Sequence, residues 1–420
     1  MRKRLQGLCP GCRRDSASLT IRYAGGEAAG AAGEAAEEAV LPTTCPICRS
    51  PSVYSLPVPC PGRAILSDGR VLAKDLAKYG CRQCGATFHP SPPTEVEVDA
   101  FYDTDYLLPT SSPASDQARA FRYAAWIGTA VGSLSKARVL ETGCGSGALL
   151  RALADQYPGM RGVGLDPAAV PEGTASPAPL SFRRGRIGDL PADDVRFDLV
   201  YAVNVVEHVS QRERFLTDIA GRMNKGGRIV LICPTAEPPN LELLFFDHLT
   251  TFTGPALAIV AGRSGLTIAA HHAAPPGVGD FQLTVLRSAQ DEPEHPLQSI
   301  DPGLEERRIR YLKAWCDLER RLEILTSGAV ALRMFGAAQT AALLRAYAPA
   351  IWERVELLTL DPPLENWPLD RKIVPYDRLA PDPARPVVLA VPPESQQAVT
   401  ARLRRDGHVP IAWNGLIDVD

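Results

Sequence analysis

The sequence predicts an α/β protein with a mostly parallel central β-sheet. Three observations support this fold class: apolar segments of strand length alternate with helical segments, the first strand runs into a glycine-rich turn, and the second ends in a carboxylate. Such alternation is typical of parallel sheets, because each parallel connection needs a crossover that a helix usually supplies. The predicted strands lie near residues 138–141, 162–165, 181–186, 198–202, 228–232, 266–270 and 282–286.

The glycine-rich turn within residues 139–150 predicts a ligand site. Gly143, Gly145 and Gly147 let the backbone turn sharply and approach a ligand, and the helix that follows offers unpaired N–H groups at its start. The G-x-G-x-G spacing is tighter than the dinucleotide fingerprint, and Glu141 just before it would repel a pyrophosphate. The turn therefore favours a ligand with a positive charge.

A second acidic residue points to a ribose. Asp166 ends the second predicted strand, nineteen positions after Gly147 (166 − 147), where folds of this kind hold a ribose by its hydroxyls. An adenosine without phosphates agrees with both Glu141 and Asp166.

Four motifs together carry a family resemblance. With residues 189–191, 197–209 and 226–232, the glycine turn resembles that of class I S-adenosylmethionine-dependent methyltransferases, over about 170 residues. The resemblance implies a Rossmann-like domain with one antiparallel edge. It also implies a cofactor site in which Glu141 faces the methionine amino end, Asp166 the ribose, and Asp189 with Leu190 the adenine. The full set of implied cofactor residues is Glu141, Gly143, Cys144, Gly145, Gly147, Asp166, Asp189, Leu190 and Asn204.

Composition restricts the partners. A chain of 420 residues with 45% apolar and 22% charged residues predicts two or three ordinary globular domains. The formal charge of −3 gives no electrostatic footprint for nucleic acid or an anionic membrane, so a small, roughly neutral substrate is favoured. The sequence has no apolar run of about 18 residues and no secretory h-region near its start, which predicts a cytoplasmic protein.

Six of the ten cysteines form three C-x-x-C pairs, which in a long cytoplasmic chain indicate metal binding rather than disulfides. Cys45 with Cys48 and Cys81 with Cys84, 32 residues apart (81 − 48 − 1), predict a zinc ribbon holding one structural Zn²⁺. Four thiolates would close the coordination shell, so a catalytic zinc is disfavoured. Reduced thiols without metal are the alternative.

The remaining cysteines near the N-terminus stay unassigned. Cys9 and Cys12 could compete as a ligand pair, but the low-complexity Ala/Gly tract at residues 24–38 makes a folded ribbon there less plausible. Cys60 has no assigned role.

Five segments are predicted. A flexible extension (1–40), the zinc-ribbon module (41–100), the methyltransferase-like domain (101–290), a helical connector (291–328) and a smaller C-terminal Rossmann-like α/β domain (329–420) follow one another. Only Gly336 remains of a glycine loop in the last domain, which favours a structural or substrate-flanking role over a second nucleotide site. The aromatic-rich segment 101–115, with Tyr106, is either a lid over the site or a hydrophobic anchor.

This layout resembles the three-domain C-methyltransferases of deoxysugar and antibiotic pathways. The likeness lies in the four cysteines named above and in residues 105–106, 111–112, 246–252 and 335–344. It implies a small-molecule acceptor, a nucleotide-linked keto-sugar, methylated on carbon. The sequence departs from the family pattern in two places. Asp247 precedes His248 where the family usually has a Tyr/Glu-His neighbourhood, and Gln339 stands where the related turn contains a lysine. The acceptor atom, C, O or N, is left open.

Carbon methylation next to a ketone requires a base that works near neutral pH, which suits histidine. We predict that His248 is this base, because it follows the fifth strand on the carboxyl edge of the sheet. The alternative is that His248 only caps the helix starting near Thr253. His208 is the second candidate base or a residue that shapes the cofactor pocket. Other functions left open are an O- or N-methyltransferase, a zinc-ribbon RNA methyltransferase, and a non-catalytic interaction protein.

Overall fold

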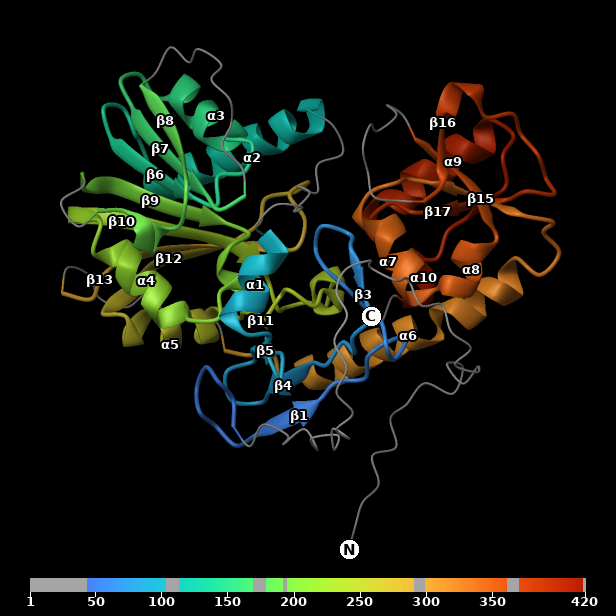
Figure 1. The fold of residues 1–420 in the computed structure, drawn as a ribbon, viewed down its shortest axis with the longest axis horizontal. Coiled ribbons are helices and arrows are strands. Elements are labelled where there is room, and N and C mark those ends of the chain that lie inside the picture. The colour runs from blue at the N-terminus through green and yellow to red at the C-terminus, as the bar shows by residue number, and fades with distance from the viewer. Residues whose placement is uncertain are drawn as a thin grey trace, which may run out of the picture.

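The computed structural model describes residues 44–102, 113–168, 179–191, 195–290, 299–360 and 370–417. The predicted extension 1–40 with Cys9 and Cys12, and the predicted lid residue Tyr106, lie outside these ranges. Two α/β lobes stand side by side, and a small N-terminal module and one long helix run beneath them (Figure 1). None of the described helices is long and apolar enough to cross a membrane.

The central lobe contains a seven-stranded sheet in the order β12-β13-β10-β9-β6-β7-β8. The strands from β6 to β10 pair in parallel, so the predicted mostly parallel sheet is confirmed. The antiparallel strand is not the edge strand that was expected: β13 runs antiparallel to both of its neighbours, and β12 lies outside it at the edge. The order reverses between β6 and β9, which places a topological switch point there. The strands are β6 (Arg138–Thr142), β7 (Arg161–Asp166), β8 (Leu180–Arg184), β9 (Phe197–Val203), β10 (Met223–Pro234), β12 (Leu266–Ala273) and β13 (Phe281–Ser288).

Helices cover both faces of this sheet (Figure 1). Alternate residues of each strand face opposite layers: Val139 packs with α2 (Pro113–Val131) and α3 (Ala148–Gln156), whereas Leu140 packs with α4 (Arg212–Ala220) and α5 (Gly254–Arg263). Burial on both faces is why the strands read as continuous apolar runs in the sequence.

The N-terminal module does not complete its sheet alone. Strands β1 (Val53–Ser55), β4 (Tyr79–Cys81) and β5 (Thr87–Phe88) pair antiparallel, and β11 (Thr250–Thr251), from the central lobe, adds a fourth strand beside β5. A hairpin of β2 (Ala64–Ile65) and β3 (Val71–Leu72) lies between β1 and β4 in the chain, and the helix α1 (Glu95–Tyr102) follows β5.

The long helix α6 (Leu304–Leu325) joins the parts of the molecule. Its Leu312 and Trp315 are fully buried in a core shared with the N-terminal module and the C-terminal lobe. Arg308, also buried, donates to Gly85 O (2.6 Å) of the module and Ala236 O (3.1 Å) of the central lobe. The three segments therefore pack as one body around this helix.

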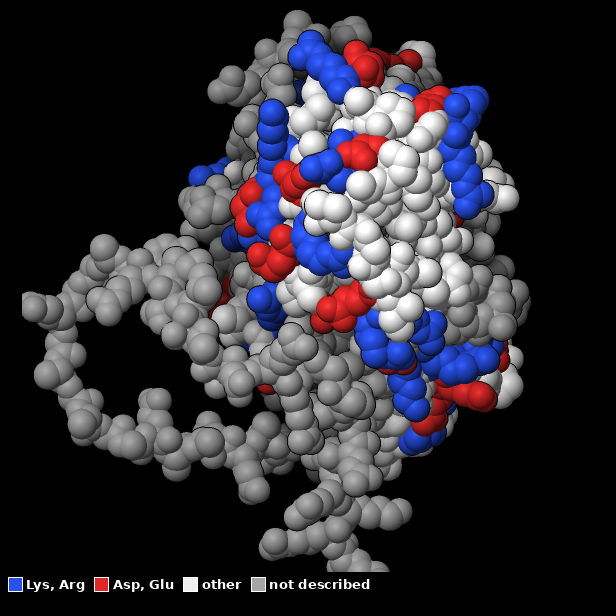
Figure 2. All heavy atoms as spheres, turned by 90° about the vertical axis from the view of Figure 1, so that its right-hand side faces the viewer, with Lys and Arg blue, Asp and Glu red and all other residues white. Residues whose placement is uncertain are grey.

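The C-terminal lobe has a second sheet, fully parallel, in the order β16-β15-β14-β17-β18. A Cβ atom at Gly336 (φ 116°) would overlap the carbonyl of Ala390, so glycine is required there by close packing between β14 and β17. The outer face of this lobe mixes basic and acidic side chains (Figure 2). Its elements are β14 (Leu332–Phe335), α7 (Gln339–Tyr347), α8 (Pro349–Glu353), β15 (Val355–Leu360), β16 (Lys372–Pro375), β17 (Val387–Leu389), α9 (Gln396–Arg405), β18 (Pro410–Ile411) and α10 (Asn414–Ile417).

Candidate active site

The glycine turn between β6 and α3 requires its glycines. Gly143, Gly145 and Gly147 have φ values of 75°, 47° and 71°, in the region that side chains rarely adopt. A Cβ atom at Gly143 would also overlap the side chain of Val205, which follows β9. The turn after β6 and the loop after β9 thus meet at the switch point and leave backbone exposed to a ligand.

A first cavity of about 510 Å³ opens above this turn. Seven of the nine residues predicted for the cofactor line it: Glu141, Gly143, Cys144, Gly145, Asp166, Asp189 and Asn204. Gly147 and Leu190 do not. Gly147 is covered by the ring of Phe182, which a Cβ atom would approach to 2.5 Å, and the Leu190 side chain packs into the core under α4.

The two carboxylates of the cavity have different environments. Asp166 accepts hydrogen bonds from the backbone N–H groups of Gly145 (2.8 Å) and Ala168 (2.9 Å), so it also holds the turn in shape. Glu141 is buried, and burial raises its pKa to about 8. Its Oε2 has no hydrogen-bond partner among the described residues. A ligand with a positively charged donor fits that atom, because an unpaired buried carboxylate is costly.

A second cavity of about 760 Å³ adjoins the first and shares Arg119, Tyr123, Asn204 and His208 with it. Its walls come from the central lobe and from the C-terminal lobe, including Pro392. Two ligands bound in these cavities would therefore meet at the carboxyl edge of the central sheet.

The two candidate histidines lie together at this junction. His208 ends the 3₁₀ helix η3 (Val206–His208), and its ring centroid is 4.6 Å from that of His248, in a T-shaped arrangement. His208 lines both cavities and His248 the second one. His248 does not cap α5, because Thr253 Oγ1 accepts the capping bond from Ala256 N (3.2 Å).

Glu242, not the adjacent Asp247, faces His248. Glu242 Oε2 lies 2.6 Å from His248 Nδ1, close enough for an ion pair, although the angle is poor for a hydrogen bond. Glu242 lies in the 3₁₀ helix η4 (Leu241–Leu244), and no sequence motif marked it.

The surroundings shift the pKa values of the two histidines in opposite directions. Burial lowers the pKa of His208 to about 4, helped by the charge of His248. Burial also acts to lower the pKa of His248, but Glu242, Asp247 and Glu207 outweigh it, so this pKa lies above its usual value. His208 is therefore neutral at physiological pH, whereas His248 can accept and hold a proton.

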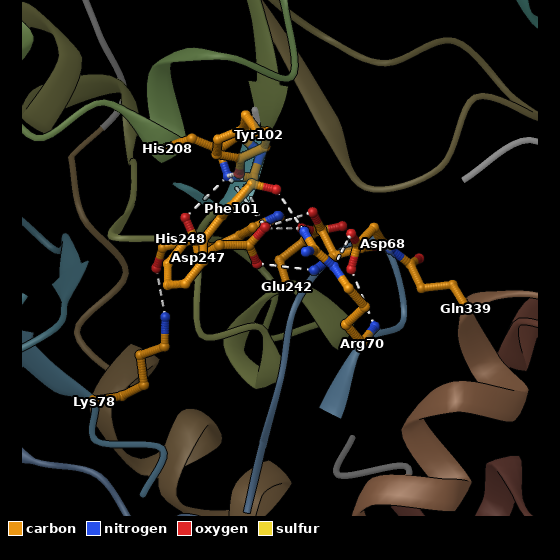
Figure 3. A network of polar contacts seen from close by, with 11 residues as sticks. Asp68, Arg70, Lys78, Phe101, Tyr102, His208, Glu242, Asp247, His248 and Gln339 are labelled. Atoms are coloured by element: carbon orange, nitrogen blue, oxygen red, sulfur yellow. Dashed lines mark hydrogen bonds and ion pairs between the residues drawn. The ribbon is translucent and has the colours of Figure 1, made fainter. Parts of the chain in front are cut away.

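Asp247 organises a polar network (Figure 3). Its carboxylate accepts hydrogen bonds from Ser67 N (2.9 Å), Ser67 Oγ (2.7 Å) and Tyr102 OH (3.0 Å). His208 Nδ1 lies 2.9 Å from Asp247 O and 2.7 Å from Tyr102 OH. Because a carbonyl only accepts, we assign the proton to Nδ1, which leaves Nε2 as an acceptor. Tyr102, within the aromatic segment 101–115, is part of this network, whereas the predicted lid residue Tyr106 lies outside the described residues.

Comparison with known proteins agrees with this geometry. Residues 140–231 match a family described as "Methyltransferase domain", which covers the glycine turn and the loop after β9. The central lobe is a methyltransferase domain. A probable S-adenosylmethionine-dependent methyltransferase of Mycolicibacterium smegmatis is 29% identical to the chain, over 23% of this chain and 37% of the relative.

The similar proteins are methyltransferases. The chain is 31% identical to a probable tocopherol O-methyltransferase of Oryza sativa subsp. japonica, over 26% of this chain and 33% of the relative. It is 38% identical to a ubiquinone biosynthesis O-methyltransferase of Rhizobium rhizogenes, over 21% and 38% respectively. The chain thus spans little more than a third of these relatives. A magnesium protoporphyrin IX methyltransferase structure from Synechocystis is 15% identical, over 47% of this chain and 97% of that one, with a TM-score of 0.35.

The N-terminal module is bonded along the segment of the methyltransferase domain that carries His248. Phe246 N donates to Ile65 O (2.8 Å), Lys78 Nζ to His248 O (2.5 Å), and His89 N to Leu249 O (3.1 Å). The β5–β11 pairing and a bond from Thr253 Oγ1 to Cys84 O (2.5 Å) continue the contact. The position of the candidate base is therefore set jointly by two parts of the chain.

The four predicted metal ligands converge inside this module. Cys45 Sγ lies 3.7 Å from Cys84 Sγ, Cys48 Sγ lies 3.5 Å from Cys81 Sγ, and all four sulfurs are within 4.8 Å of one another. These separations are far longer than a disulfide bond of about 2.05 Å. They match the edge of a tetrahedron with Zn–S bonds of about 2.3 Å, which is roughly 3.8 Å. The donor set therefore fits a structural zinc ion.

Proposed function

We propose that this protein transfers a methyl group from S-adenosylmethionine to a small-molecule acceptor. The observation that carries the proposal is the junction of the two cavities beside His208 and His248. The first cavity would take the cofactor and the second the acceptor, with the C-terminal lobe forming part of the acceptor's wall.

The residues of the first cavity fit this cofactor. Glu141 would face its ammonium group through the turn, Asp166 would accept hydrogen bonds from the ribose hydroxyls, and Asp189 would lie against the adenine. Bound S-adenosylmethionine supplies an electrophilic methyl group. Proximity and alignment between the two cavities would account for much of the rate.

His248 is proposed as the base. Its imidazole would take the proton from the acceptor, and the carboxylate of Glu242, 2.6 Å from Nδ1, would stabilise the imidazolium that forms. Neutral His208, held by Asp247 and Tyr102, would keep Nε2 free to accept a hydrogen bond from the acceptor. The proton then leaves His248 for solvent after the acceptor has been methylated.

C-methylation of a keto-deoxysugar is the acceptor chemistry we propose. The nucleotide-linked form of that sugar is what the resemblance in the three-part layout implies. A carbon acid needs a base near neutral pH, and the environment of His248 supports that role. Cys45, Cys48, Cys81 and Cys84 are proposed to hold one structural zinc, whose module positions this base.

The test is incubation of the purified protein with methyl-labelled S-adenosylmethionine and a panel of keto-sugars and their hydroxyl analogues. NMR of the product locates the label on carbon or oxygen, and Asp166→Ala serves as the control that should lose cofactor binding. If calorimetry finds no binding of S-adenosylhomocysteine to the wild type, the proposed function is wrong. A label found on oxygen would contradict only the proposed acceptor chemistry.

A further inference from the structure

Acidic residues line the second cavity on both sides of the boundary between the lobes. Four carboxylates line it, and they come from separate parts of the chain: Glu207, Glu242, Asp280 and Glu394. Glu394 belongs to the C-terminal lobe, in the 3₁₀ helix η6 (Pro393–Ser395), and the other three to the central lobe. The wall that faces an acceptor thus carries negative charge on both sides of the boundary between the lobes.

The cations of the same wall are already engaged. Arg119 is paired with Asp116 (2.9 Å) and Arg307 with Asp301, and neither carboxylate partner is among the residues that line the second cavity. Among the described residues, no lysine or arginine pairs with Asp280 or Glu394. The guanidinium groups therefore do not neutralise the cavity's own carboxylates. His248 pairs with one of them, Glu242 (2.6 Å), which leaves Asp280 and Glu394 without a basic partner among the described residues.

Glu207 independently indicates a missing hydrogen-bond donor. Its side chain is 1% exposed, and neither carboxylate oxygen has a hydrogen-bond partner among the described residues. Burial raises the pKa of Glu207 to about 8 against the opposing charge of His248, and the charges of Glu242 and Asp247 add to the rise. Buried polar groups in folded proteins are rarely left unpaired, so the geometry points to a ligand that brings N–H or O–H donors.

The acidic groups act on one another. The pKa of Asp280 is raised by burial first, and then by the negative charges of Glu394 and Glu242. A positive charge between the walls would relieve this repulsion, whereas a phosphate would add to it. Gln339, which stands where the related turn contains a lysine, donates its amide to Ser67 O (3.1 Å) and supplies no charge.

We propose that the acceptor carries a protonated amine, and that Asp280 and Glu394 bind it from opposite lobes across the second cavity. The inference rests on the proposed methyl transfer. It retains a sugar as the acceptor but replaces the nucleoside diphosphate with an ammonium group. Charge-assisted hydrogen bonds to two carboxylates are the recognition chemistry that this wall offers.

The experiment measures binding, so it does not depend on turnover. Glucosamine, N-acetylglucosamine, glucose 1-phosphate and dTDP-glucose are titrated into the full chain with saturating S-adenosylhomocysteine at pH 7. Glucosamine should bind roughly tenfold more tightly than N-acetylglucosamine, which keeps the nitrogen but removes its charge. Both phosphorylated sugars should bind more weakly than glucosamine.

Matched variants locate the effect. Asp280→Asn and Glu394→Gln should each reduce the preference for glucosamine several-fold, and the double variant should abolish it. Glu323→Gln, which removes an exposed carboxylate of α6 outside the cavity, should leave it unchanged. An unaltered affinity for S-adenosylhomocysteine shows that each variant is folded.

Three results would overturn the inference: tighter binding of dTDP-glucose than of glucosamine, equal binding of the amine and its N-acetyl derivative, or a preference that survives the double variant. Failure of S-adenosylhomocysteine to bind the wild type would instead refute the proposed function.

Discussion

Replacing His248 with asparagine tests the proposed base. General-base catalysis contributes about 10²–10⁴-fold, so His248→Asn should lower kcat by that factor, equivalent to about 3–5 kcal/mol in the barrier. Asparagine keeps a polar group of similar reach and removes the titrating nitrogen. Because His248 lines the second cavity and not the first, the Kd for S-adenosylhomocysteine should stay within about twofold of wild type.

The pH profile separates the two histidines. A base works when it is neutral, and the pKa of His248 lies above its usual value because the carboxylates outweigh burial, so kcat should rise with pH through a limb above about pH 6.5. His208, with its pKa lowered to about 4, should give no limb in this range. Glu242→Gln removes the nearest negative charge and should move the limb to lower pH.

The assay is the initial rate of S-adenosylhomocysteine formation between pH 5 and 9, followed by mass spectrometry, with binding measured by calorimetry. His208→Asn is the matched control and should keep the limb. The reasoning is refuted if His248→Asn retains wild-type turnover, or if the limb disappears in His208→Asn and persists in His248→Asn.

Three further predictions concern other parts of the molecule. Asp166→Ala should weaken binding of S-adenosylhomocysteine at least roughly tenfold, since charge-assisted hydrogen bonds contribute about 1.5–3 kcal/mol each; an unchanged Kd would contradict the assignment. Cys81→Ser with Cys84→Ser should release one zinc per chain and lower turnover, because the module holds the segment of His248; metal analysis that finds full zinc content would exclude this ligand set. Lys78, whose pKa burial lowers from 10.5 to about 8, is protonated more readily in the unfolded chain, so wild-type stability should rise between pH 8 and 10.5 relative to Lys78→Met. Equal slopes of Tm against pH for the two proteins would show that Lys78 titrates normally.

Much of the central domain could be predicted because its signals are local. The strands are buried on both faces and therefore appear as uninterrupted apolar runs, and the turn after the first strand needs glycines whatever surrounds it. The position of Asp166 could be predicted in the same way, because the last residue of a parallel strand lies at the carboxyl edge of the sheet. Spacing also paired the four cysteines, whose sulfurs the fold brings within 4.8 Å.

The two predicted cofactor residues that do not line the cavity show the limit of motif transfer. Gly147 and Leu190 stand in the right motifs, but one lies beneath the ring of Phe182 and the other points into the core. A motif fixes the path of the backbone more firmly than the direction of each side chain.

The alternation of strands and helices, the glycine turn with its two carboxylates, and the placement of two histidines at one edge of the sheet follow from local sequence patterns. The surroundings of those histidines depend on how distant segments pack together. Ser67 reaches Asp247 across 180 positions and Lys78 reaches His248 across 170, and the acidic wall of the second cavity forms where two lobes meet. No local pattern encodes such contacts, because they arise when separately folded segments pack around shared cores such as the one that buries α6.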